Sequence, residues 1–177
     1  MKGMAALVLV LGIAVLAACG STGHTVVEEP LQPDARSAVV IFMQYEKTDA
    51  QVWDGETPIG TFKGLSRSSR YVMSWKTTPG AHIFVVRTTN FAHKRMTLQA
   101  GRTYYFRVYG VAAGPLNTLT FIAIAEENKK YYDEFMAKSN VLKTTHIQFD
   151  DDWRKDFVTA NDGKWLNDIR EYIKKAK

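Results

Sequence analysis

Short apolar stretches separated by turn residues run through the middle of the chain, over residues 37–125. Ser37–Glu46 is a nearly continuous run of β-branched, aromatic and other apolar residues, as in a buried strand. Arg70–Lys76 instead shows a period of two, with its aromatic residues on one face. This texture predicts about seven or eight strands in one domain. We therefore expect a mainly β fold, a single antiparallel β-sandwich of the immunoglobulin or transthyretin type.

Turn residues define the expected hairpins. Asp54-Gly55 lies between two short extended runs, and both residues tolerate positive φ, so a hairpin is predicted here. Pro58 has no backbone N–H to donate, which places the second arm at a sheet edge or next to a bulge. Further turns are predicted at Pro79-Gly80 and at Ala100-Gly101.

After residue 125 the pattern changes, and residues 126–177 are expected to form a C-terminal helical extension. Glu126–Lys138 predicts a helix, and Val141–Phe149 is a candidate last strand. The run Asp150–Asp152 suits the start of a further helix, because negative charge is favourable at a helix N-terminus. A final helix, capped by Asn161 or Asp162, is expected to carry one apolar stripe made of Trp165, Ile169, Tyr172 and Ile173.

The chain begins with Lys2 and an apolar run, Met4–Leu16, that is shorter than the roughly 20 residues of a membrane-spanning helix. This is the pattern of an export signal. The junction Leu16-Ala17-Ala18-Cys19 resembles the lipobox of bacterial lipoproteins. The resemblance implies cleavage before Cys19 and attachment of acyl chains such as palmitate to it. Residues 1–18 are then the signal peptide, and residues 19–36 a lipidated tether.

The second residue of the expected mature chain is Gly20 rather than Asp. The sorting rule of many Gram-negative lipoproteins then implies the periplasmic face of the outer membrane, with the inner membrane and the cell surface as alternatives. Cys19 is the only cysteine, which also fits lipidation, because exported proteins usually pair their cysteines.

The charge balance is mildly basic, with 23 Lys and Arg against 18 Asp and Glu and a net charge of +5. A nucleic-acid interface carries a denser basic patch, and export also argues against such a partner. The expected partners are therefore the membrane, through the lipid on Cys19, and an envelope protein. A cell-wall glycan or an anionic lipid is the alternative.

Three segments of the β region follow one another in a recognisable order: Val52–Gly60, Thr78–Val86 and Leu98–Val108. Together they resemble PEGA-type domains and closely similar lipoprotein domains of unknown function. The matching positions are Asp54, Gly55, Gly60, Pro79, Gly80, His82, Ala100, Gly101, Tyr104 and Tyr105. The resemblance implies a small β-sandwich on the envelope side and no catalytic residues.

No catalytic, cofactor or metal motif is found in the sequence, and the expected protein is not an enzyme. The four histidines show no metal-ligand spacing, and Asp150–Asp152 lacks the glycine and glutamate of a calcium loop. His82 is interpreted as a structural residue whose ring hydrogen-bonds near the turn. An active site assembled from residues scattered along the chain stays open as the less favoured reading.

Two basic stretches remain as candidate contacts for an anionic group, because Arg and Lys match phosphate and carboxylate. They are expected in a loop and at a hairpin tip, and their residues are Arg67, Arg70, Lys94 and Arg95. The favoured function is a non-catalytic interaction or structural module, such as an accessory subunit of an envelope assembly. Binding of glycan or anionic lipid through the basic residues is the alternative.

Overall fold

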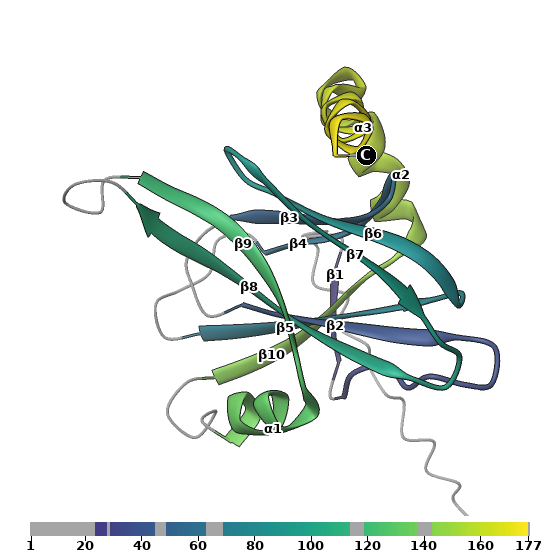
Figure 1. Cartoon of the computed structure of the whole chain (residues 1–177). Coiled ribbons are helices and arrows are strands. Elements are labelled where there is room, and N and C mark those ends of the chain that lie inside the picture. The colour runs from purple at the N-terminus through teal and green to yellow at the C-terminus, as the bar shows by residue number, and fades with distance from the viewer. Residues whose placement is uncertain are drawn as a thin grey trace, which may run out of the picture.

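The computed structural model describes residues 24–27, 29–44, 49–62, 69–113, 119–137 and 143–176. In this part of the chain, strands form two sheets and the helices follow after residue 128 (Figure 1). The strands are β1 (His24–Val27), β2 (Ala38–Gln44), β3 (Ala50–Asp54), β4 (Thr57–Phe62), β5 (Ser69–Thr77), β6 (Gly80–Arg87), β7 (Phe91–Leu98), β8 (Thr103–Ala113), β9 (Leu119–Glu127) and β10 (Lys143–Phe149). The helices are α1 (Lys129–Ala137), α2 (Asp151–Thr159) and α3 (Lys164–Lys175), with a 3₁₀ turn at Ala160–Gly163. The expectation of a mainly β fold with C-terminal helices is confirmed.

The larger sheet is mixed, in the order β1-β10-β5-β2-β8-β9. β2 pairs with β8 in parallel, and β10 pairs with β5 in parallel. The prediction of an antiparallel fold is therefore wrong for this sheet. The reason is connectivity: parallel neighbours need a long crossover, and the whole second sheet lies between β2 and β8 in the chain.

The smaller sheet is antiparallel throughout, in the order β4-β3-β6-β7. Its β3–β4 hairpin turns at Gly55, whose φ is +57°, as the Asp-Gly pair predicts. Pro58 lies in β4, an edge strand, and the β3–β4 register shifts between Val52 and Trp53. The edge position and the bulge expected from Pro58 are both confirmed.

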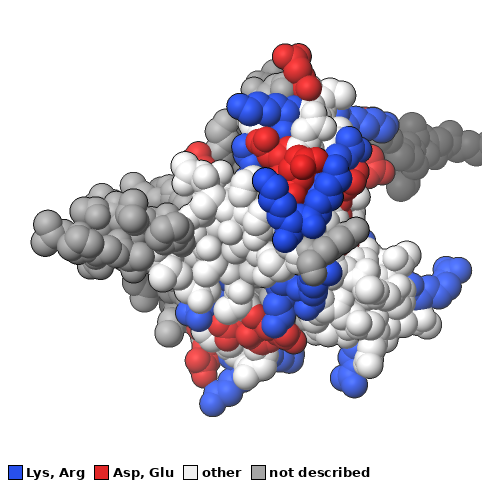
Figure 2. Space-filling view, turned by 45° about the horizontal axis from the view of Figure 1, so that its top comes forward, with Lys and Arg blue, Asp and Glu red and all other residues white. Residues whose placement is uncertain are grey.

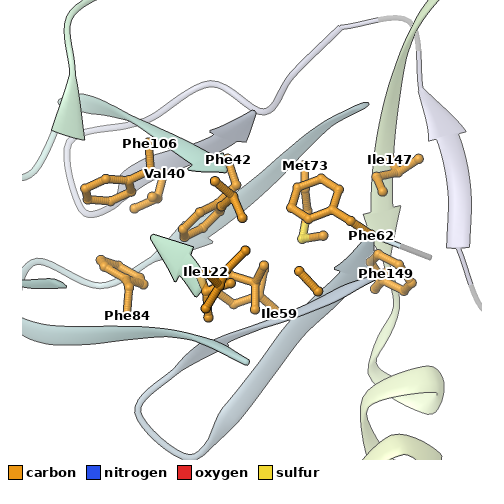
Figure 3. Packing of buried hydrophobic residues seen from close by; sticks show 14 of the residues in the cluster. Val40, Phe42, Ile59, Phe62, Met73, Phe84, Phe106, Ile122, Ile147 and Phe149 are labelled. Carbon is orange, nitrogen blue, oxygen red and sulfur yellow. The ribbon is translucent and has the colours of Figure 1, made fainter. Parts of the chain in front are cut away.

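The two sheets share one core. Phe42 of the larger sheet lies 5.6 Å from Phe84 of the smaller sheet and 5.5 Å from Phe106, measured between ring centroids. Figure 3 shows these rings with Met73, Ile122 and other apolar side chains filling the space between strands of both sheets. Such interdigitation is what two facing apolar surfaces achieve on folding.

The larger sheet recruits segments from both ends of the described chain. β1 comes from the stretch expected to be a tether, and it pairs antiparallel with β10. β10 comes from the expected helical extension and lies between β1 and β5. β1 and β10 are thus part of the larger sheet.

Two details of the C-terminal region differ from the sequence interpretation. Glu126 and Glu127 still belong to β9, and the first helix begins at Lys129 after Asn128, whose side chain accepts from the Tyr131 N–H. The final helix has Gly163 at its N-cap without a side-chain cap bond, so neither Asn161 nor Asp162 caps it. Asp162 instead adopts a φ of +54° in the 3₁₀ turn.

Helices cover the outer faces of the two sheets. Phe135 of α1 packs on Val39, Ile41 and Val72 of the larger sheet. On the other side, Ile169 of α3 is fully buried against the smaller sheet, as the apolar stripe of this helix predicts. Figure 1 shows α1 and α3 on opposite sides of the molecule. No helix of the described residues is both long and apolar enough to cross a membrane.

Candidate functional site

A groove of about 910 Å³ lies where the smaller sheet, β9 and the C-terminal helices meet. Its size is at the upper end of ligand pockets, which hold roughly 300–1,000 Å³. Strand ends form one side, and α2, the 3₁₀ turn and α3 form the other. The lining residues are Asp49, Ala50, Gln51, Thr61, Arg87, Thr88, Thr89, Ile122, Trp153, Asp156, Phe157, Ala160 and Trp165.

The helical side of the groove is aromatic. Trp153 and Phe157 are one turn apart on α2, and their ring centroids lie 4.5 Å apart in a stacked arrangement. Trp165 of α3 continues the row at 4.9 Å from Phe157. All three side chains are half-buried, so part of each faces solvent. This row, Trp153, Phe157 and Trp165, is called the aromatic wall below.

Local sequence chemistry fixes the start of α2 and therefore the wall. The Asp150 carboxylate accepts a hydrogen bond of 2.7 Å from the Trp153 N–H, as an N-cap residue does. Asp151 and Asp152 occupy the first turn, where negative charge is favourable. The helix-start interpretation of the acidic run is confirmed, and the same capping bond anchors the first residue of the wall.

Arg87, at the end of β6, sits under the groove and is only 17% exposed. Its guanidinium donates to Gln51 Oε1 at 3.2 Å and to Asp168 Oδ2 at 3.1 Å. It also lies 5.8 Å from the ring centroids of Phe91 and Trp165. Asp168 thus balances the charge of Arg87, and the residue ties β3, β7 and α3 together.

Several polar groups at the groove have no hydrogen-bond partner among the described residues. They are the hydroxyls of Thr61 and Thr89, the carboxylate of Asp156 and the indole N–H groups of Trp153 and Trp165. Asp156 and Thr89 are exposed. Both donors and acceptors are therefore available to a bound molecule.

Of the four basic residues expected to contact an anion, the structure describes the side chains of Lys94 and Arg95. Lys94 and Arg95 lie within β7, so the expected hairpin tip is wrong; the tip is at Thr88–Asn90. Lys94 is paired with Glu126 at 3.3 Å, and Arg95 donates to the Ala176 carbonyl at 2.9 Å.

The side chains of the other predicted site residues lie outside the described part of the structure. Arg70 belongs to β5 in the other sheet, and its side chain is outside the described set. Arg67 and Cys19 both lie outside the described residues. An anion site at Arg67 and Arg70 and lipidation of Cys19 therefore stay predictions.

His82 is structural in the described fold, as expected. Its Nε2 lies 2.9 Å from the Thr78 carbonyl beside the turn, and its Nδ1 lies 2.9 Å from the Asp54 carboxylate. Asp54 also accepts from Trp75 Nε1 at 3.1 Å. Two motifs that carry the PEGA resemblance thus meet in one hydrogen-bonded cluster, which links β3 to β6. The cluster is far from the aromatic wall in the sequence.

Sequence reasoning missed the groove. Arg87, at the bottom of the groove, is a single arginine at the end of an apolar strand. Nothing in the residues around it in the sequence distinguishes it from an arginine that is exposed to solvent. The i,i+4 pair of Trp153 and Phe157 was the available signal, although such a pair is more often core.

Within the described ranges, no group of three or more His, Cys, Asp or Glu side chains is placed to hold a metal ion. In comparisons with known proteins, no family model and no curated protein matches the chain.

Proposed function

We propose that this protein is a bacterial envelope lipoprotein, anchored through a lipid on Cys19, whose folded domain acts as a non-catalytic binding module. Its place is the periplasmic face of the outer membrane. The binding site is the groove with the aromatic wall. The lipobox resemblance at Leu16–Cys19 supports the anchor, and the shape of the groove supports binding.

The aromatic wall is the single observation that carries the binding role. Three aromatic residues line an open groove and keep part of their surface in contact with water, although further burial would be favourable. Partly exposed Trp side chains with unpartnered N–H groups are characteristic of contact surfaces, because one end is apolar and the other is polar. A structural role alone does not require an open groove at this place.

We also propose that the β domain is a sandwich related to PEGA-type, immunoglobulin-like or transthyretin-like folds. The shared core between two facing sheets supports this, as does the cluster of Asp54 and His82. The parallel pairs β2–β8 and β10–β5 depart from the antiparallel sheets of that type. The proposal therefore concerns the packing of the sheets and not their strand order.

Photo-crosslinking in the native envelope tests the binding role. A photoreactive amino acid at Thr89, on the rim of the groove, should give a discrete cross-linked product. The control position is Lys130 on α1, whose side chain is 84% exposed on the opposite side of the molecule. Equal products from both positions, or none from Thr89, would contradict a binding role for the groove.

A further inference from the structure

The molecule that fits the groove can be named by its chemistry. Resting on the proposed binding role, we propose that the groove binds an uncharged oligosaccharide. Charge balance, the aromatic wall and the polar groups of the rim each contribute to this assignment.

Charge balance argues against an anionic ligand. Among the described residues that line the groove, Arg87 is the only Lys or Arg, and it is already paired with Asp168. Asp49 and Asp156 also line it, so the described lining residues carry no excess of positive charge although the chain is basic. Figure 2 shows basic and acidic side chains next to one another over the C-terminal helices, in the upper part of the view, rather than a field of one sign. A phosphate or carboxylate would find no unpaired cation among the lining residues that the structure describes.

The aromatic wall matches the flat, apolar face of a sugar ring. Aromatic faces carry negative partial charge and attract groups with a positive edge, and the C–H bonds on one side of a pyranose present such an edge. Trp153 and Trp165 flank Phe157 in a row, with neighbouring centroids 4.5 and 4.9 Å apart. Trp153 and Phe157 stack on each other with an interplanar angle of 24°, so each covers part of a face of the other. The surface that the wall offers to the C–H groups of a sugar is the solvent-exposed remainder of its three rings.

The polar groups around the wall match hydroxyls. A sugar hydroxyl both donates and accepts, so its site needs acceptors and donors side by side. Asp156 supplies a free carboxylate, and the two indole N–H groups and the Thr61 and Thr89 hydroxyls supply the rest. A volume of about 910 Å³ is large for one sugar ring and suits a short chain.

Calorimetry with defined sugars tests the proposal on the full lipidated protein in a detergent without a sugar headgroup. The probes are chitotetraose, which is uncharged, tetragalacturonate, which is anionic, and the glucosamine tetramer, which is cationic. We expect chitotetraose to bind and tetragalacturonate not to bind. Trp153→Ala should weaken chitotetraose binding by about fivefold to tenfold, the size of one aromatic contact.

Two further variants keep the result interpretable. Trp153→Phe keeps an aromatic ring at this position and should recover most of the affinity. Circular dichroism of Trp153→Ala at the temperature of the titration checks that this variant is folded, because Trp153 also packs on Phe149. Lys130→Ala, on the opposite side, should bind like the wild type. Tighter binding of either charged probe would overturn the uncharged assignment. If no probe binds while Thr89 still cross-links to a protein, the saccharide inference fails and the binding role stands; if both fail, both proposals fall.

Discussion

Gly60 in β4 lies against two core side chains, Phe149 and Met73, and we predict that its replacement by alanine destabilises the fold. A Cβ at this position would lie 2.7 Å from the Met73 sulfur and closer still to the ring of Phe149. Ordinary contacts of a Cβ are 3.4–4 Å, so both side chains, or the backbone of β4, must move. Both are buried, and Phe149 also packs against Trp153 with centroids 4.2 Å apart. The Phe149 ring therefore cannot withdraw without disturbing the aromatic wall.

The cost of Gly60→Ala follows from this crowding. Overpacking a well-filled core costs about 1–3 kcal/mol, and three close contacts with two buried side chains put this site at the upper end, near 3 kcal/mol. For a chain of this size that corresponds to a fall of about 6–12 °C in Tm. Urea unfolding followed by fluorescence measures the free energy of unfolding. The fluorescence of the folded state should change as well, because Trp153 moves.

Two variants control this experiment. Gly55→Ala adds the same methyl group where nothing lies within 4 Å, so only its φ of +57° is strained, at about 1 kcal/mol. Gly60→Ala combined with Phe149→Leu should recover part of the loss, since the smaller side chain leaves room. A change below about 0.5 kcal/mol for Gly60→Ala, the level of an ordinary surface substitution, would refute the close-packing argument.

Three other predictions test the fold and the anchor. Asp54→Ala should lower the free energy of unfolding by about 2–4 kcal/mol, because it removes the shared acceptor of a half-buried cluster that includes His82. Asp54→Asn should cost less. Equal, small losses in the two variants would contradict this role of Asp54. Hydrogen bonds from Lys76 and, to a lesser extent, from the Arg36 N–H hold the pKa of Asp34 well below its ordinary value of 3.8. The Asp34 carboxylate therefore stabilises the fold at pH values above 3.8, and this contribution is lost as the pH falls through the lowered pKa. An NMR titration of Asp34 should therefore show its pKa rising in Lys76→Met, and an unchanged pKa would refute the pairing. Cys19→Ser should abolish labelling by a clickable palmitate analogue and release the protein from the membrane fraction, and retained label would disprove lipidation at this residue.

The parts of the fold that depend on neighbouring residues could be predicted from the sequence. Asp54-Gly55 closes a hairpin because its backbone preferences match the turn, and the apolar stripe around Ile169 buries α3. Strand pairing at long range could not be predicted in this way. β10 lies between β1 and β5, antiparallel to β1 and parallel to β5, and this placement depends on how the chain crosses the domain, which no short segment encodes.

The groove eluded prediction for the same reason. It joins the start of β3, the end of β6, the middle of β9 and the C-terminal helices, which lie more than a hundred residues apart along the chain at the extremes, from Asp49 to Trp165. The basic residues singled out from the sequence were candidates because charge is visible without a fold. The described structure engages Lys94 with Glu126 and Arg95 with a carbonyl, which only tertiary contacts could reveal.

The four indole N–H signals of the protein offer the most direct test of the groove as a saccharide site. Trp53 is fully buried and Trp75 donates to Asp54, whereas Trp153 and Trp165 line the groove. Titration of chitotetraose into ¹⁵N-labelled protein should shift the Trp153 and Trp165 signals together and saturate. The Trp53 signal should shift less, because its buried ring lies 5.7 Å from that of Phe157, and the Trp75 signal should stay in place. Unmoved Trp153 and Trp165 signals, or equal shifts of all four, would contradict the account.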